Sequence, residues 1–261
     1  MKITVIGGGN MGGAIARGAV SRSVVKAENV TVSDPSDTVQ ASFMSFNSAI
    51  NLTSDNAEAI KDADLVIVAV KPWLVETVFN QIKDTVDANR QIVVSIAAGI
   101  SFEMLKSYLN KDTVPALFRV IPNTAITLGE SATFVCSEGA TTEQRATVCG
   151  LLSALGKVFE VQENQMMALT ALASCGIAYI FKYIDASIKG GVEMGVENAM
   201  AQEIVMQTVK GALCMLETNK TEPQTEIDKV TTPGGITLKG LEKMEECGFS
   251  SAVIEGLKAS R

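Results

Sequence analysis

A glycine-rich turn near the start of the chain is the segment best suited to chemistry. A short apolar run at residues 2–6 leads into glycines at positions 7, 8, 9, 12 and 13, and a helix-forming stretch follows. This G-x-G-x-x-G spacing between a strand and a helix is typical of dinucleotide-binding folds. Gly7 permits a tight turn, Gly9 admits a pyrophosphate, and Gly12 lets the helix approach the strand. We predict a pyrophosphate on the free amides of this helix start, with a merely structural turn as the alternative.

An aspartate follows the second apolar run, which covers residues 30–33. Asp34 lies about 25 residues beyond Gly9, a spacing at which a carboxylate bonds the adenosine ribose diol. A carboxylate would repel a 2′-phosphate, and no Lys or Arg lies between Asp34 and Gln40 to bind one. The local charge therefore favours NADH, unless Asp34 only caps a turn or a helix.

Two further strand ends and a second glycine loop complete the candidate groups. Val70-Lys71-Pro72 ends an apolar run, and small residues at 95–99 would let a flat ring lie against the backbone. The loop at 231–237, Thr-Thr-Pro-Gly-Gly-Ile-Thr, precedes a helix, so its amides and a threonine hydroxyl form a small anion site. It lacks the lysine of a phosphate loop, so a carboxylate is the expected anion. Purely structural roles remain the alternatives at all three places.

The residue types that are absent narrow the chemistry further. The 261 residues contain no histidine, which excludes His-dependent triads, imidazole zinc sites and a histidine acid or base. We expect no metal site. A net charge of −7 argues against nucleic acid as a partner. Five scattered cysteines, no C-x-x-C pair and no signal-peptide core at the start indicate a cytoplasmic protein with reduced thiols.

Alternating strands and helices in the first half must position these groups. Apolar runs at 65–70 and 91–96 suit strands that are buried on both faces of a parallel sheet. Ser101 is the expected N-cap of a helix that ends at Leu109. The remaining predictions are strands at 117–121, 133–136 and 158–161 and a helix at 142–155. Repeated βα units predict the α/β class, with a Rossmann-type doubly wound sheet in a dinucleotide-binding domain at 1–162.

The pattern changes near Glu163, beyond which we expect no strand. Residues 164–189 are predicted to form one long apolar helix, followed by helices at 198–217, 222–230, 238–246 and 250–259. The predicted all-α domain at 163–261 serves dimerisation and substrate binding. Because these helices would struggle to cover their own apolar surface, we expect a homodimer. The most apolar stretch, 166–181, is short for a bilayer, so we expect a buried helix and no membrane partner.

The order of these motifs resembles that of the pyrroline-5-carboxylate reductase family over essentially the whole chain. The shared segments are GGGNMGGAI at 7–15, SDNAE at 54–58, VAVKP at 68–72, SIAAG at 95–99, RVIPNT at 119–124, TAL…GIAY at 170–179, VTTPGGITLKGLE at 230–242 and GF at 248–249. Many families share the glycine turn, so the VTTPGG segment ahead of the last helices is the specific part.

The resemblance implies hydride transfer from NADPH or NADH to 1-pyrroline-5-carboxylate, a small imine carboxylate, which gives proline. It places the cofactor against Gly7, Gly8, Gly9, Asn10, Met11, Gly12, Ser33, Asp34, Asn56, Ala69, Lys71 and Ala97. It places the substrate carboxylate on the amides of Gly235, Ile236 and Thr237 and on the Thr237 hydroxyl, with both protomers contributing to the site. A protonated imine is already electrophilic, so little beyond orientation is needed. Thr237, or a water that it holds, is the candidate proton donor, and rings of dimers occur in similar proteins.

Some residues depart from the family pattern. The family usually has Ser-Gly-Ser-Gly-Pro-Ala-Tyr before the long helix, whereas residues 173–179 are Ala-Ser-Cys-Gly-Ile-Ala-Tyr. Ala125 and Ile236 also replace the usual residues, and these changes bear on substrate identity and rate. Two other functions stay open. One is a β-hydroxyacid dehydrogenase, which would need a lysine where Ile180 stands, and the other is a non-catalytic nucleotide-binding regulatory protein.

Overall fold

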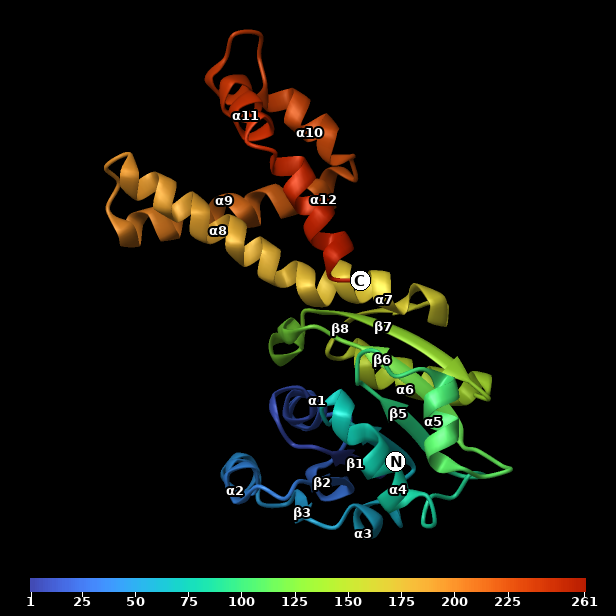
Figure 1. Ribbon diagram of the computed structural model, residues 1–261. Helices are drawn as coiled ribbons and strands as arrows, with labels where there is room; N and C mark the ends of the chain where they lie inside the picture. The colour runs from blue at the N-terminus through green and yellow to red at the C-terminus, as the bar shows by residue number, and fades with distance from the viewer. The chain divides into compact units, whose positions relative to one another are not determined.

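The computed structural model describes all residues 1–261, which divide into two compact units, Met1–Ser174 and Cys175–Arg261. Figure 1 shows a sheet flanked by helices in the first unit and helices alone in the second. The division between the units falls inside a helical segment. The domain boundary after residue 162 therefore stays a prediction.

The first unit is built on one eight-stranded sheet. Its strands are β1 (Ile3–Ile6), β2 (Val30–Ser33), β3 (Asn51–Thr53), β4 (Leu65–Val68), β5 (Ile92–Ser95), β6 (Ala116–Ile121), β7 (Ser131–Glu138) and β8 (Gly156–Glu160). They lie in the order β3-β2-β1-β4-β5-β6-β7-β8, and every neighbouring pair is parallel except β6 and β7. The chain moves outward from β1 to β3 and then returns to β4. This places the topological switch point, where ligands of such sheets bind, between β1 and β4.

Helices cover both faces of this sheet. They are α1 (Asn10–Ser21), α2 (Asp37–Phe46), α3 (Asn56–Ile60), α4 (Val75–Ile82), α5 (Phe102–Leu109), α6 (Thr142–Ser153) and α7 (Met166–Leu169). The helices α1, α2 and α6 pack into one hydrophobic layer, and α3, α4, α5 and α7 into the other. Strand residues alternate between the layers, so that Leu65 and Ile67 face the first and Val66 and Val68 the second. The predicted doubly wound fold is confirmed.

Local signals account for most of the elements in this unit, though not for all of them. Ser101 caps α5 as predicted, with its Oγ accepting a hydrogen bond from the Met104 amide at 3.2 Å. The sequence did not predict α2, β3, α4 or the 3-10 turn Thr124–Leu128. Nor did it predict that β7 runs antiparallel to β6. The connection at 122–130 is too short for the crossover that a parallel strand requires.

The second unit contains only helices. They are α8 (Gly176–Glu193), α9 (Asn198–Asn219), α10 (Pro223–Val230), α11 (Ile236–Glu246) and α12 (Phe249–Ala259). As predicted, no strand follows β8. The predicted long helix over 164–189 is confirmed as a continuous helical segment, Glu163–Glu193, which contains a π-helical turn at Thr170–Cys175 between α7 and α8. The Thr170 hydroxyl donates to the Met166 carbonyl at 2.6 Å, and such hydroxyl bonds bend a helix.

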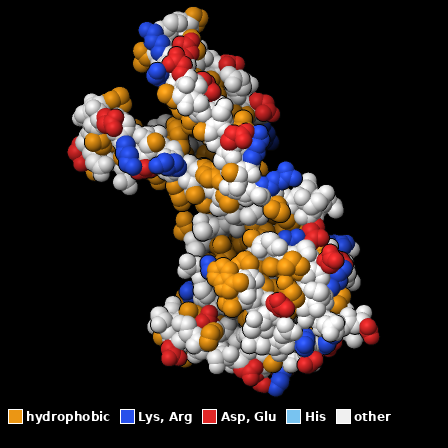
Figure 2. Space-filling model, viewed as in Figure 1, with side chains coloured by type: hydrophobic (Ala, Val, Ile, Leu, Met, Phe, Trp, Pro, Cys, Tyr) orange, Lys and Arg blue, Asp and Glu red, His pale blue; other side chains and the backbone are white.

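The second unit also exposes large apolar side chains. Phe181, Met194, Ile204 and Leu213 are each more than half exposed, and Figure 2 shows many such side chains, in orange, on the surface of this unit. By length and composition alone, Glu163–Glu193 would be long enough to cross a membrane, a test that the core helices of soluble proteins also pass. Only 11% of its apolar part is buried, so the expected burial of this helix is not found within the single chain. An apolar surface of this extent is typical of a protein–protein interface.

Candidate active site

The first glycine turn joins β1 to α1 at the switch point of the sheet. Gly7 has a φ of +93°, and a Cβ atom there would lie 2.8 Å from the backbone oxygen of Ala69. A Cβ atom on Gly12 would lie 2.0 Å from the Gly7 carbonyl oxygen, whereas one on Gly9 would meet no atom within 4 Å. The turn therefore has a tight bend at Gly7, close packing at Gly12 and open space over Gly9.

The N-terminus of α1 lacks a protein partner for its first amides. Gly9 is its N-cap, no side chain caps it, and its first turn contains no acidic residue. In contrast, the N-cap residue of each of α2, α3, α5 and α6 accepts a hydrogen bond through its side chain from a backbone amide of the first turn. The amides of Gly9, Asn10 and Met11 have no partner inside the helix. They lie at the positive end of the helix dipole, so this terminus fits the pyrophosphate of a dinucleotide.

Asp34 holds the glycine turn through its side chain. Its Oδ2 accepts a hydrogen bond from the Gly8 amide at 2.8 Å, and its Oδ1 accepts one from the Ser36 amide at 2.9 Å. The Gly7 amide donates to the Ser33 carbonyl at 2.8 Å. The amides of Gly7 and Gly8 are therefore used inside the protein and are not free for a ligand. The half-buried carboxylate retains a lone pair on each oxygen, which leaves a ribose contact compatible with the turn.

Ser33 and Asn56 form a hydrogen-bonded chain beside Asp34. The Ser33 hydroxyl donates to Asn56 Oδ1 at 2.7 Å, and Asn56 Nδ2 donates to Gln81 Oε1 at 2.6 Å. Ser33 is buried, so its hydroxyl orients Asn56 at the start of α3. Gln81 belongs to α4 and was not predicted, because no motif in that helix distinguishes it.

Ala69, Lys71 and Ala97 follow the ends of the neighbouring strands β4 and β5. The Ala69 amide donates to the last carbonyl of β1 at 2.7 Å, which fixes Ala69 beside the glycine turn. Lys71 is exposed and precedes the 3-10 turn Pro72–Leu74, in which Trp73 is 74% exposed. Ala97 is buried at the start of the loop after β5. All the residues predicted to contact the cofactor thus lie at or near the carboxyl ends of the strands.

The second glycine loop leads into α11. Gly235 is the N-cap of this helix, again without a capping side chain and without an acidic residue in the first turn. The Gly235 amide donates to the Thr232 carbonyl at 2.8 Å, so it shapes the turn and is not free for a substrate. The amides of Ile236 and Thr237 begin the helix and have no partner within it. Ile236 is 88% exposed, and Thr237 is also exposed.

The two sets of residues together provide orientation and charge but no strong base. The structure contains no group of three or more His, Cys, Asp or Glu side chains placed to hold a metal ion. Each set offers a helix N-terminus that attracts an anion. The second set adds one hydroxyl, that of Thr237. Taken separately, the first set suits the pyrophosphate of a dinucleotide and the second a small carboxylate.

Comparisons with known proteins agree on one family. A family profile described as NADP oxidoreductase, coenzyme F420-dependent, matches residues 2–99, and one described as pyrroline-5-carboxylate reductase dimerisation matches residues 163–261. Pyrroline-5-carboxylate reductase of Arabidopsis thaliana is 35% identical over 100% of this chain and 94% of its own length. Pyrroline-5-carboxylate reductase 1 of Dictyostelium discoideum is 35% identical over 99% of this chain, which spans 48% of that protein. The crystal structure of Plasmodium falciparum pyrroline carboxylate reductase with NADP bound matches with a TM-score of 0.90 and 28% identity, covering 100% of this chain and 95% of that chain.

Proposed function

The chain belongs to the pyrroline-5-carboxylate reductase family, and we propose that its two glycine loops hold the two reactants of the family's reaction. The reaction is the reduction of 1-pyrroline-5-carboxylate to L-proline by NAD(P)H, the last step of proline biosynthesis. NAD(P)H, when bound, supplies the hydride that reduces the C=N carbon. The protein must therefore bind the cofactor and the imine and orient them relative to each other, which requires no histidine.

The open N-terminus of α1 is the observation that carries the proposal for the cofactor. The amides of Gly9, Asn10 and Met11 would hold the pyrophosphate, and Asp34 would face the adenosine ribose. Gly7, Gly8 and Gly12 would act by shaping the turn. The amides of Gly7 and Gly8 already donate to protein acceptors, and Gly12 packs tightly against the Gly7 carbonyl. Ser33, Asn56, Ala69, Lys71 and Ala97 would line the site at the carboxyl ends of the strands.

The second loop is proposed to hold the substrate carboxylate. The Ile236 and Thr237 amides and the Thr237 hydroxyl would donate to it, while Gly235 keeps the turn in shape. Thr237, or a water that it holds, would supply a proton to the ring nitrogen. Because the loop is exposed, residues of a second protomer are proposed to complete the site.

The match to the family's dimerisation domain supports a homodimer. The exposed apolar side chains of α8 and α9 supply the physical reason for this association. We further propose that the dimers assemble into rings and that the enzyme works in the cytoplasm, where its five free cysteines stay reduced.

A side-by-side assay with both donors tests the proposal. When 1-pyrroline-5-carboxylate is added, the purified protein should oxidise NADH or NADPH and produce proline. The loss of the absorbance of the reduced nicotinamide monitors the reaction. Thr237→Val provides the link to the second loop, because it removes the hydroxyl and keeps the shape of the side chain. A flat trace with both donors would refute the enzymatic function, and full activity of Thr237→Val would refute the proposed substrate loop.

A further inference from the structure

Arg119 and Glu163 form an ion pair behind the loop that follows β5. Arg119 Nη1 lies 2.7 Å from Glu163 Oε1, and Arg119 is 6% exposed. The Nε atom of Arg119 is also buried and has no hydrogen-bond partner. A buried guanidinium is costly without a counterion, so Arg119 depends on the Glu163 carboxylate. In the pair of Lys106 with Glu138 the cation is far more exposed, at 40% against 7% for the Arg119 side chain, while the two carboxylates are similarly exposed.

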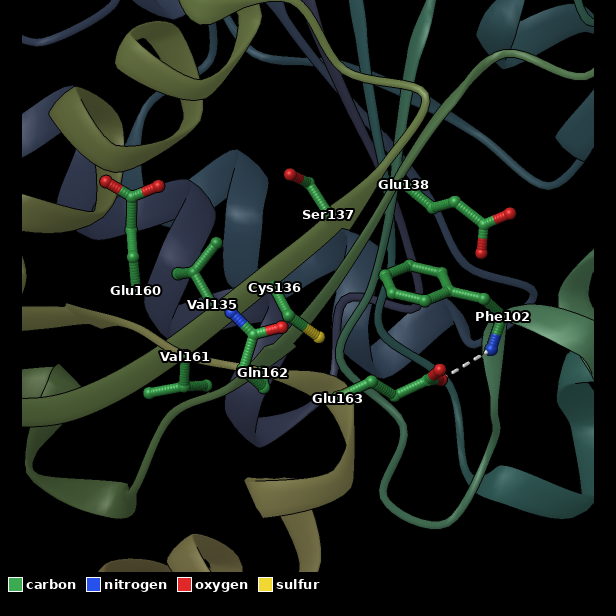
Figure 3. Close-up of a pocket in the computed structure, with 9 residues that line it drawn as sticks. All are labelled: Phe102, Val135, Cys136, Ser137, Glu138, Glu160, Val161, Gln162 and Glu163. Carbon is green, nitrogen blue, oxygen red and sulfur yellow. Dashed lines mark hydrogen bonds between the residues drawn. The ribbon is translucent and has the colours of Figure 1, made fainter.

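The same carboxylate oxygen also holds the start of α5. The Phe102 amide donates to Glu163 Oε1 at 2.8 Å, shown as the dashed line in Figure 3. Phe102 is the first residue of α5, and the first amides of a helix have no partner within it. A negative charge at this end of the helix is also favoured by the helix dipole.

The contacts of Glu163 with Arg119 and with the Phe102 amide lie at the two ends of the loop at residues 96–101. Ser95 ends β5 and lies opposite Arg119 in the register of β5 and β6. Phe102 begins α5 and is bound to Glu163. The loop is thus held at one end by the sheet that carries Arg119 and at the other by Glu163. Ala97, which the proposed function places against the cofactor, lies within this loop.

The cavity beside Glu163 lies next to the base of the loop, whereas Ala97 and Ile100 of the loop itself are buried in the hydrophobic layer that contains α4 and α5. The cavity has a volume of about 370 Å³, and Phe102, Cys136 and Glu163 line it (Figure 3). Burial raises the pKa of the Cys136 thiol to about 11, which keeps it neutral near pH 7. The thiol therefore offers Arg119 no charge. Glu163 is the carboxylate that links Arg119 of β6 to the Phe102 amide, in addition to the backbone pairing of β5 with β6.

We propose that Glu163 is a positioning residue, whose pair with Arg119 fixes the loop at 96–101 against the nicotinamide end of the cofactor. The proposal rests on the proposed function, because it requires Ala97 to line the cofactor. A small displacement of the loop would change the orientation of the nicotinamide and leave the pyrophosphate at α1 undisturbed. Its main effect is therefore on kcat and on the nicotinamide half of cofactor binding.

Binding of two matched ligands to the full-length protein tests this proposal. The variants are Glu163→Gln, which keeps an acceptor for the Phe102 amide and removes the charge, and the double variant Arg119→Met/Glu163→Gln, which removes both charges. The ligands are whichever of NADH and NADPH serves as donor, and its nicotinamide-free form, ADP-ribose or 2′-phospho-ADP-ribose. The Kd values are measured by calorimetry, and kcat and KM by the assay above.

We expect Glu163→Gln to weaken donor binding about fivefold and the nicotinamide-free ligand less than twofold. We expect kcat to fall on the order of 100-fold, with a smaller change in the KM for the imine. The double variant should recover thermal stability and keep the low kcat. The matched control is Glu138→Gln, which breaks the more exposed ion pair between Glu138 of β7 and Lys106 of α5. It should change kcat and both Kd values less than about twofold.

Two results would overturn the proposal. If the double variant regains the kcat of the native protein, the pair only neutralises its own charges and does not position the loop. If both ligands weaken equally, the effect is a general loss of structure. Should Glu163→Gln fail to fold, the double variant alone decides between these results. Failure of the proposed function is distinguishable, because the native protein would then bind no donor or turn over no imine.

Discussion

The two glycine loops begin a helix in the same way but differ in their surroundings. Both α1 and α11 have a glycine N-cap, no capping side chain and no acidic residue in the first turn. In the first loop, a Cβ atom on Gly7 or Gly12 would collide with backbone atoms. In the second, a Cβ atom on Gly234 would meet no atom within 4 Å, one on Gly235 would meet only Thr232 of the same turn, and Ile236 is almost fully exposed.

This difference indicates how each anion site is built. The first loop is held by β1, β4 and the Asp34 carboxylate, so it has its shape before a ligand arrives. The second is held mainly by its own turn, through the bond from the Gly235 amide to the Thr232 carbonyl. We therefore expect substitutions in the first loop to act on stability and cofactor binding. Substitutions in the second loop should act on the substrate.

The largest expected effect comes from Gly12→Ala. The added methyl would lie 2.0 Å from the Gly7 carbonyl oxygen, where no flexible side chain can move aside. We expect the free energy of unfolding to fall by about 3 kcal/mol or more. Urea unfolding followed by circular dichroism measures this. In the second loop, Gly234→Ala should cost only about 1–2 kcal/mol, from its φ of +73°. Equal losses in the two variants would contradict the contrast between the loops.

Gly9→Ala should separate cofactor binding from stability within the first loop. Its φ of −65° suits alanine, and no atom lies within 4 Å of the added methyl. The unfolding free energy should change by less than about 0.5 kcal/mol. Donor affinity should fall on the order of 100-fold, because the methyl occupies the approach of the pyrophosphate. Isothermal titration calorimetry measures that affinity, and an unchanged Kd would remove the pyrophosphate from this position.

Thr237→Val should affect only the substrate side. Loss of one hydrogen bond to a charged group corresponds to a fall in kcat/KM of about 10- to 100-fold. The donor Kd and the unfolding free energy should stay unchanged, since the Thr237 hydroxyl is exposed. The control is Thr208→Val in α9, whose hydroxyl donates to the Ile204 carbonyl at 2.8 Å. A similar loss in both variants would point to a general effect on the second unit.

The smallest expected effect concerns the choice of donor. Asp34→Ala removes the charge that would repel a 2′-phosphate and also the acceptor for the Gly8 amide. Both donors should bind less tightly, and the preference for NADH over NADPH should fall about fivefold. The ratio of the two kcat/KM values measures this, with Asp37→Ala as a control for a nearby charge. An unchanged ratio would mean that Asp34 serves the turn alone.

Local sequence signals predicted much of the fold, including the glycine turn that joins β1 to α1. Apolar runs at 65–70 and 91–96 correspond to β4 and β5, and Ser101 caps α5 as expected. The doubly wound sheet followed from their order. Short elements escaped prediction because few residues define them: β3 has only three residues, and α4 has no capping side chain.

Contacts between distant residues were beyond the sequence. The bond from the Gly8 amide to Asp34 joins residues 26 apart, and the bond from the Phe102 amide to Glu163 joins residues 61 apart. Each depends on the register of several strands, which no local pattern fixes. This is why the sequence indicated Asp34 as a ribose ligand or as the cap of a local turn, which its bond from the Ser36 amide bears out, and gave no sign of its bond from the Gly8 amide. The contacts of Glu163 with Arg119 and with the Phe102 amide were likewise visible only in the folded chain.

The exposed indole of Trp73 gives this protein a built-in optical signal. It is the only tryptophan in the chain, so every photon of indole emission comes from the turn that follows β4. Reduced nicotinamide absorbs in the range where indole emits, so a donor bound to the same unit quenches that emission by energy transfer. Binding and release of NADH or NADPH can therefore be followed by stopped-flow fluorescence on unlabelled protein. Oxidation of the donor removes the quenching and restores the tryptophan emission.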